Sequence, residues 1–294
     1  MLSFHLAMMN SITVRCMTET DLPAADELRR VVGWNQTLAD WRRLLELAPS
    51  GCFVACLGQN VVGCVTTTVY GATLAWVGMM LVHPDHRGKG IGKLLMQHSI
   101  RHAQEAGVGC IRLDATPLGR PLYEKLGFLP EWEVTRYRRD PGPVDTPSLI
   151  PPHYVRQAVE GDWPAIDRID AQGFGASRSH LLRRLVRDGA ALLVVTDRSV
   201  SGWGMFRSGA GADYLGPMIC QDSEGARALA AALLSRSHGR SLIWDIPDPN
   251  LAAVALAKGL NAVPVRPLTR MRLGPDLSPS NVAMQFALAD PALG

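Results

Sequence analysis

A glycine-rich loop between an apolar stretch and a helix-like stretch holds the residues of this chain that are best suited to chemistry. It reads Arg87-Gly88-Lys89-Gly90-Ile91-Gly92, and Lys93 follows it. Its three glycines lack Cβ atoms, so the backbone amides can curve around a ligand and approach it closely. The helix expected after the loop points its unpaired N–H groups at the same place. With the cations of Arg87 and Lys89, these amides predict an anion site, and a diphosphate is its natural guest.

Two common diphosphate loops do not match this pattern. A Walker loop needs a glycine five positions before its Gly-Lys pair and a hydroxyl residue after it, but Arg87 and Leu94 take those places. A dinucleotide fingerprint needs GxGxxG, whereas the glycines here are spaced two apart. A turn without a ligand is the other alternative, and three glycines flanked by cations are costly for it.

The Arg87-x-x-Gly90-x-Gly92 arrangement resembles the acyl-CoA loop of the GNAT superfamily of N-acetyltransferases. The segment from Pro121 to Phe128 resembles the family's second signature, and the two motifs extend the resemblance over about residues 12–138. The resemblance implies acetyl-CoA as donor, a primary amine of a small molecule as acceptor, and direct attack of the amine on the thioester. It also implies that the strand before the loop binds the pantetheine arm and that the loop surrounds the pyrophosphate. The cofactor-binding residues implied are Leu81, Val82, His83, Arg87, Gly88, Lys89, Gly90, Ile91, Gly92 and Lys93.

Tyr123 lies where the family often places the tyrosine that protonates the departing CoA thiolate. The alternative is an aromatic side chain that only packs on its helix. The general base stays unassigned between Asp114 and a water relay, because Asp114 can equally be structural: Asp245 takes the matching place in the second half. The intact loop and Tyr123 favour an enzyme, and a non-catalytic acyl-CoA sensor that regulates a partner is the alternative function.

Around these motifs the hydrophobic pattern predicts the order β-α-β-β-β-α-β-α-β. This is an α/β fold, mixed with α+β character, in which a largely antiparallel mixed sheet is flanked by helices. A stretch at about 30–50 is expected to be loop-like and to border the acceptor site, where Trp34 is a candidate lining residue. The strands are expected at 12–18, 52–57, 61–70, 74–82, 110–115 and 132–138, and the helices from about 21, from the loop to about 106, and at about 119–126.

The second half of the chain repeats the first. Val14-Arg15 and Asp21–Ala24 reappear as Val155-Arg156 and Asp162–Ala165 at a constant offset, and Thr135-Arg136 reappears as Thr269-Arg270. A run of such echoes in one order predicts two tandem GNAT-like domains. The expected organisation is an extension at 1–11, a catalytic domain at 12–139, a proline-rich linker at 140–152 and a degenerate GNAT-like domain at 153–294.

The second domain is expected to bind no cofactor. The counterpart of its loop keeps only Gly225, brings the acidic Glu224, and has Ala255 in place of Tyr123. Its strands are expected near 190–196, 201–207, 213–220 and 241–246, and its helices near 223–236 and 249–258. Alternating apolar residues at 282, 284, 286 and 288 predict one extra strand at the end.

Composition excludes several other classes. Hydrophobic residues at 47% and charged residues at 19% are typical of a globular protein, and a net charge of +3 is too small to indicate nucleic-acid binding. No apolar run reaches the roughly 20 residues that span a bilayer, and the start of the chain has no basic n-region, so neither a membrane span nor a signal peptide is expected. The chain is expected to be cytoplasmic and to be a monomer or a homodimer. Cysteines without CxxC pairs indicate reduced core thiols. His98 and His102 share a helix face but have no third ligand, so no metal is expected.

Overall fold

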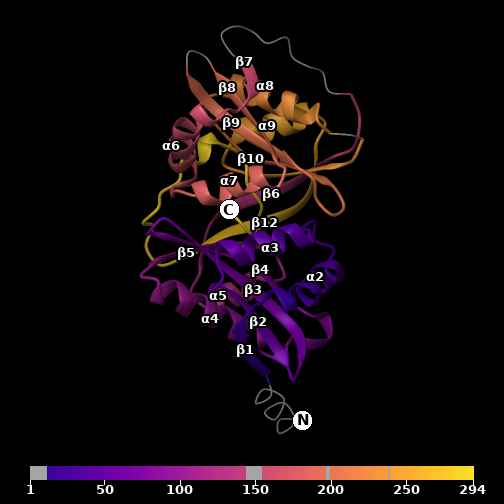
Figure 1. The fold of residues 1–294 in the computed structure, drawn as a ribbon, viewed down its shortest axis with the longest axis vertical. Coiled ribbons are helices and arrows are strands. Elements are labelled where there is room, and N and C mark those ends of the chain that lie inside the picture. The colour runs from indigo at the N-terminus through magenta and orange to yellow at the C-terminus, as the bar shows by residue number, and fades with distance from the viewer. Residues whose placement is uncertain (1–11, 144–153, 197–198, 238) are drawn as a thin grey trace.

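Two halves of similar topology are stacked along the long axis of the molecule in a computed structural model (Figure 1). The structure describes residues 12–143, 154–196, 199–237 and 239–294. The extension expected at 1–11 and most of the linker expected at 140–152 lie outside the described residues.

The elements of the two halves follow the same order. The first half contains β1 (Ile12–Cys16), η1 (Glu19–Asp21), α2 (Leu22–Val31), α3 (Leu38–Leu47), β2 (Cys52–Leu57), β3 (Asn60–Tyr70), β4 (Leu74–Val82), η2 (Pro84–His86), α4 (Ile91–Glu105), β5 (Cys110–Ala115), α5 (Arg120–Lys125) and β6 (Leu129–Arg139). The second half contains β7 (Tyr154–Gln157), η3 (Glu160–Asp162), α6 (Trp163–Phe174), α7 (Ser179–Arg187), β8 (Ala191–Thr196), β9 (Val200–Arg207), β10 (Asp213–Cys220), α8 (Ser223–Leu234), β11 (Leu242–Pro247), α9 (Leu251–Gly259), β12 (Val263–Leu273), η4 (Val282–Met284) and β13 (Gln285–Ala287). The predicted class, a mixed and largely antiparallel sheet flanked by helices, is confirmed, because among the described strands only β4–β5 and β10–β11 pair in parallel.

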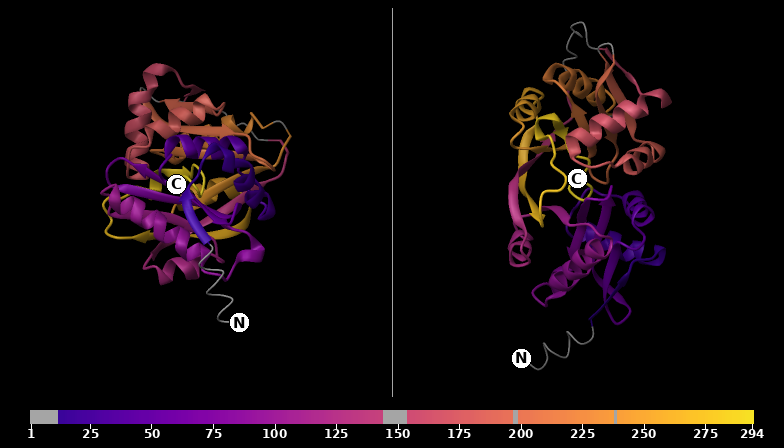
Figure 2. Two further views of the ribbon diagram at one scale, coloured as in Figure 1. Left: turned by 60° about the horizontal axis from the view of Figure 1, so that its bottom comes forward. Right: turned by 90° about the vertical axis from the view of Figure 1, so that its left-hand side faces the viewer.

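The two halves share one continuous sheet, whereas the repeat predicted a sheet in each. The strand order is β1-β2-β3-β4-β5-β12-β6-β11-β10-β9-β8-β7. The last long strand of each half therefore pairs with the fifth strand of the other: β12 lies beside β5, and β6 lies beside β11. The yellow strand in Figure 2 shows this crossing between the halves.

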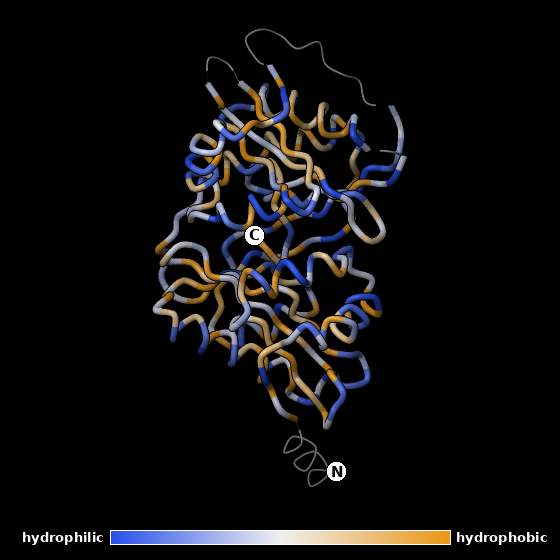
Figure 3. Tube along the Cα trace, in the orientation of Figure 1, coloured by the Kyte–Doolittle hydropathy of each residue, from blue (hydrophilic) through white to orange (hydrophobic). Residues whose placement is uncertain are grey.

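The hydrophobic core follows this shared sheet. On one face of the first half, α4 packs over β-strand residues such as Val65 and Val77. On the opposite face, α2 and α3 join α6 and α7 in a cluster that spans both halves. Figure 3 shows apolar residues in the strands within each half, and polar residues along the outer helices and loops and around the junction of the two halves. The two halves are thus held together by core packing as well as by strand pairing.

Two sequence predictions are wrong in detail. The stretch 38–47, expected to be loop-like, is helix α3, which begins at a capping box between Thr37 and Asp40 and buries Trp41 and Leu44. The alternation at 282–288 predicted a full extra strand, but only Gln285–Ala287 is a strand, after a turn of 3₁₀ helix. The strand pairs with Met218 and Ile219, near the C-terminal end of β10, and lies off the main strand order.

The shared sheet makes a direct prediction for the isolated first half. Residues 12–143 alone should fail to form a cooperatively folding monomer, because β5 and β6 would each lose their partner β12 and expose unpaired edges. Thermal unfolding followed by circular dichroism, with size-exclusion chromatography of the fragment and the whole chain, measures this. A monomeric fragment with a sharp transition close to that of the whole chain would contradict it.

Candidate functional site

Strand β4 separates from β5 partway along its length. Parallel pairing is limited to Leu74–Trp76 against Cys110–Arg112, so the following residues of β4, including Leu81 and Val82, have no strand partner on the β5 side among the residues that the structure describes. Near the separation, Cys64 pairs with Leu81 but Thr66 pairs with Gly78, which leaves one extra residue on β4. Met79 there has a φ of 46°. This bulge re-aims the strand and leaves a free backbone edge along its second part.

The glycine-rich loop follows that free edge. Gly88 and Gly90 have φ values of 73° and 80°, a conformation that side chains rarely adopt. Gly90 is the N-cap of α4, and no side chain caps the helix. Among the described hydrogen bonds, the backbone N–H groups of residues 88–93 donate none. Six amide donors with no protein acceptor at a helix N-terminus form a site that fits a diphosphate.

The cations of the loop are held but not neutralised. Arg87 donates from Nε to the carbonyl oxygen of Val82 at 3.1 Å, and Lys89 donates from Nζ to the carbonyl oxygen of Asp85 at 2.9 Å. Within the described part of the chain, neither side chain, nor that of the exposed Lys93, has a carboxylate partner. Positive charge therefore remains available beside the free amides.

Gly92 brings the loop close to its neighbours. A Cβ at this position would lie 3.1 Å from Met80 Cε and 3.2 Å from Leu122 Cδ2. The first turn of α4 thereby packs between the free edge of β4 and helix α5, and Ile91 beside it is buried. His83, which was predicted to contact the cofactor arm, follows β4 directly and donates its backbone N–H to the carbonyl oxygen of Val62.

Tyr123 lies on α5 in the apolar cluster beneath α4. It is 7% exposed, and its ring lies 6.0 Å from that of Phe128. Burial raises the pKa of its phenol above the ordinary value, so the hydroxyl stays protonated at neutral pH. The hydroxyl makes no hydrogen bond to any described residue, which leaves its proton free for a ligand.

Asp114, one of the two alternatives for the base, is fully buried and doubly bonded. Its two oxygens accept hydrogen bonds from Arg270 Nε and Nη2 at 2.8 and 2.9 Å. Burial raises the pKa of this carboxyl, and the Arg270 charge opposes the rise. The guanidinium also lies over the ring of Trp76. Both oxygens are engaged, so the geometry favours the structural reading of Asp114.

Arg270 comes from β12, in the second half, and sequence reasoning did not place it near the site. The arrangement is reciprocal: Arg136 on β6 bonds Asp245 on β11 at 2.7 Å through both Nε and Nη2. The sequence held a signal, because Thr135-Arg136 repeats as Thr269-Arg270 and Asp114 repeats as Asp245. The repeat did not reveal that each arginine serves the other half.

In the second half, both the helix N-terminus that corresponds to that of α4 and the strand edge that corresponds to that of β4 are occupied by residues of the chain itself. Asp222, the N-cap of α8, accepts a hydrogen bond from the N–H of Gly225 at 2.7 Å, so a carboxylate already occupies its anion position. Strand β13 pairs with Met218 and Ile219 of β10. It thereby covers the edge that corresponds to the free edge of β4. The carbonyl oxygen of Phe286 in β13 also accepts a hydrogen bond from Trp244 Nε1 at 2.8 Å.

The connection between α2 and α3 is bound to the second half. Asn35 accepts hydrogen bonds from the N–H groups of Gly211 and Ala212 and donates to the carbonyl oxygen of Ala212. Trp34, the candidate acceptor residue, is partly buried against the cluster that spans both halves. The region expected to border the acceptor is therefore closed on one side by the second half.

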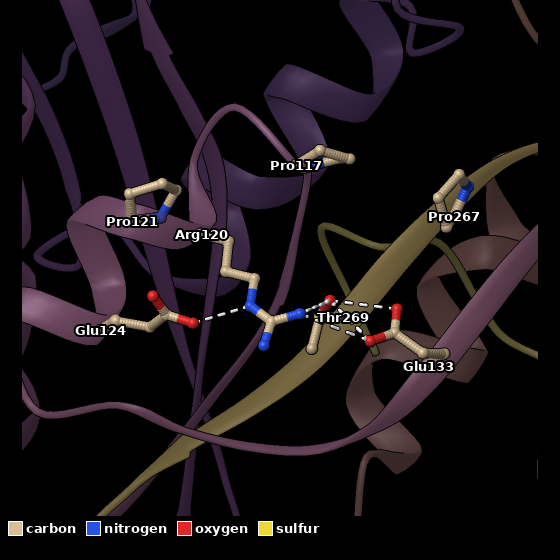
Figure 4. A pocket seen from close by; sticks show the side chains of 7 residues that line it. All are labelled: Pro117, Arg120, Pro121, Glu124, Glu133, Pro267 and Thr269. Carbon is tan, nitrogen blue, oxygen red and sulfur yellow. Dashed lines mark hydrogen bonds and ion pairs between the residues drawn. The ribbon is translucent and has the colours of Figure 1, made fainter.

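A separate cavity of about 440 Å³ lies between α5, β6 and β12. Its polar and charged groups are paired with one another: Arg120 donates to Glu124 at 2.7 Å, and Thr269 donates to Glu133 at 3.0 Å (Figure 4). None of the predicted cofactor-binding residues lines it; its walls are Pro117, Arg120, Pro121, Glu124, Glu133, Pro267 and Thr269.

His98 and His102 pack their rings beside Phe53. Across residues 12–143, 154–196, 199–237 and 239–294, no group of three or more His, Cys, Asp or Glu side chains is arranged to hold a metal ion. Over the same residues, no helix is both long and apolar enough to cross a membrane.

Comparison with known proteins gives the same family for both halves. A model described as "Acetyltransferase (GNAT) family" matches residues 8–128, and one described as "Acetyltransferase (GNAT) domain" matches residues 166–287. The crystal structure of a Pyrococcus horikoshii protein named as an acetyltransferase superposes with a TM-score of 0.81 at 24% identity, over 97% of this chain and 96% of that one.

Two curated relatives share parts of the sequence. The N-acetyltransferase YitH of Bacillus subtilis, itself uncharacterized, is 26% identical over 201 residues, which are 68% of this chain and 66% of YitH. The holothin acyltransferase of a Pseudoalteromonas species is 30% identical over 126 residues, which are 40% of this chain and 42% of that protein. The chain thus spans just under two thirds of the first relative and less than half of the second.

Proposed function

The chain belongs to the GNAT family of acetyltransferases and carries the family's domain twice, and from this premise we propose that it is an N-acetyltransferase with one active site per chain, in its first half. The donor is acetyl-CoA, and the acceptor is the primary amine of a small molecule. The observation that carries the proposal is the contrast between the two halves. The N-terminus of α4 has free amides and no cap, whereas that of α8 is capped by Asp222.

Different residues of the first half bind different parts of acetyl-CoA. The amides of residues 88–93 and the charges of Arg87, Lys89 and Lys93 hold the diphosphate. The pantetheine arm pairs along the free edge of β4 at Leu81 and Val82, with His83 at its outer end. The absence of a strand partner on this edge supports the assignment, because an extended ligand can add to a sheet edge as a strand does.

The reaction is a direct transfer. The amine attacks the carbonyl carbon of the thioester, the C–N bond forms, and the C–S bond breaks. Tyr123 donates its phenolic proton to the departing sulfur, which is a fair leaving group because a thiol has a pKa near 8.5. The amine loses its proton to water, since the double hydrogen bond from Arg270 leaves Asp114 no free oxygen.

A small acceptor fits the surroundings better than a peptide. The α2–α3 connection, which borders the acceptor side, is tied by Asn35 and Gln36 to the second half. A peptide substrate needs an open groove, and these ties close one side of the region.

Isothermal titration calorimetry with acetyl-CoA and with CoA tests the donor site, and thiol release against a panel of amines tests the reaction. Binding of one acetyl-CoA per chain, with thiol release for at least one amine, is the expected result. Absence of binding would sink the proposal. Binding without release for any amine would point to an acyl-CoA sensor instead.

Replacing Tyr123 with phenylalanine should lower kcat about 10- to 100-fold and leave the Kd of acetyl-CoA within about threefold. The loss is modest because the thiolate leaves without much help. Tyr154→Phe, at an exposed tyrosine of the second half, is the matched control and should leave both quantities unchanged. An unchanged kcat in Tyr123→Phe would show that Tyr123 only packs on its helix.

A further inference from the structure

The last described residues, 288–294, lie at the junction between the two halves, where both views place the C-terminal end of the ribbon (Figures 1 and 2). We refer to residues 290–294 as the closing segment. Asp290, Ala292 and Leu293 are each at most 5% exposed. The mechanism proposed above gives this buried segment no role.

Side chains from both halves hold the closing segment in place. Gln36 donates from Nε2 to both carboxylate oxygens of Asp290, at 2.8 and 3.0 Å. Tyr70 donates to the carbonyl oxygen of Leu293 at 2.9 Å, and Trp76 donates from Nε1 to that of Pro291 at 3.1 Å. Arg178 of the second half donates to the carbonyl oxygen of Gly294 at 2.7 Å. Residues of the first half thus fix most of the segment.

The segment touches β4 where that strand leaves β5. A Cβ on Gly78 would overlap the carbonyl oxygen of Ala292 and come within 2.7 Å of its Cα. Gly78 lies two residues beyond Trp76, whose pairing with Arg112 is the last between the two strands. The absence of a side chain at Gly78 is what lets the backbone of Ala292 lie directly on the strand.

This contact lies at the inner end of the proposed donor site. From the loop, an arm running back along β4 from Val82 to Gly78 covers roughly 13–17 Å at about 3.3 Å per residue. There the Trp76–Arg112 pair closes the gap between the strands. On one face, Val77 belongs to the apolar core under α4. On the other face, over Gly78, lies the closing segment.

We propose that the closing segment forms the inner wall of the acyl site and restricts the donor to short acyl chains. This inference rests on the proposed function, since it presumes that an acyl-CoA lies along β4. An acetyl group ends before the wall, whereas a longer chain meets the backbone of Ala292 where it lies against Gly78. Because a packed wall discriminates even single methylene groups about tenfold or more, the effect on a hexanoyl chain is large.

The test compares binding of CoA, acetyl-CoA and hexanoyl-CoA by titration calorimetry, so that no acceptor is needed. In the wild-type chain, hexanoyl-CoA should bind at least tenfold more weakly than acetyl-CoA. In a chain ended after Ala289, and in Asp290→Ala, which removes the acceptor of the Gln36 bonds, this ratio should fall at least fivefold. The affinity for CoA itself should stay the same.

Asp213→Ala is the matched control, because it also removes a buried carboxylate, one that pairs with Arg240 in the second half. It should keep the wild-type ratio, and thermal unfolding checks that each variant is folded. If the shortened chain does not fold, Asp290→Ala decides. An unchanged ratio in a folded variant, or equal wild-type binding of both acyl-CoAs, overturns this inference and leaves the proposed function standing. Failure of the wild type to bind CoA overturns both.

Discussion

Gly90→Asp should weaken binding of CoA and acetyl-CoA by about 100-fold or more while the protein stays folded. The reason is visible in the second half, where Asp222 caps α8 and fills the anion position with a carboxylate. An aspartate at the N-cap of α4 would compete for the same free amides and repel the diphosphate. Its φ of 80° costs a side chain about 1–2 kcal/mol, which a folded domain tolerates. Titration calorimetry at fixed ionic strength measures the affinity.

Gly90→Asn separates charge from shape. Asparagine caps helices about as well as aspartate and tolerates the left-handed conformation, but it carries no charge. It should weaken binding markedly less than aspartate does. If aspartate weakens binding of CoA no more than asparagine does, the charge at this position does not account for the loss of affinity. If both bind like the wild type, the loop does not hold the diphosphate.

The parts of the fold that local sequence specifies could be predicted. The strands expected at 52–57 and 74–82 coincide with β2 and β4, because unbroken apolar runs bounded by turn residues leave few alternatives. The loop could be predicted as an anion site for the same reason: glycine spacing, cations and a following helix lie within one short segment. Helix α3 was missed although its signal, the Thr37–Asp40 capping box, was present in the sequence.

The pairing of β12 with β5 and of β6 with β11, which exchanges the last long strands between the halves, could not be predicted, because each strand had two equivalent partners to choose from. β6 and β12 carry the same Thr-Arg pattern, so either could complete either sheet with the same local hydrogen bonds. The choice depends on contacts far apart in the chain. The path of residues 288–294 could not be predicted for the same reason. Their apolar character predicts that they are buried, but the place where they are buried depends on how the two halves pack.

Because β12 of the second half pairs with β5 of the first, Arg270→Met should lower the free energy of unfolding by about 3–5 kcal/mol: it leaves the fully buried carboxylate of Asp114 without its partner. Chemical denaturation followed by tryptophan fluorescence measures this. Arg227→Met is the matched control. It breaks an exposed pair with Glu224 and should cost less than about 1 kcal/mol.

A double variant, Asp114→Leu with Arg270→Met, tests whether the lost stability comes from the unpaired charge or from disturbed packing at this position. Removing both charges leaves an apolar contact beside Trp76, so most of the lost stability should return. If the double variant is as unstable as the single one, the ion pair does not account for the loss. If the folded double variant still turns over with an unshifted acidic limb of its pH–rate profile, which is the limb that a general base controls, Asp114 is not the base. The two halves would then be joined by this carboxylate, and the chemistry would be left to Tyr123 and solvent.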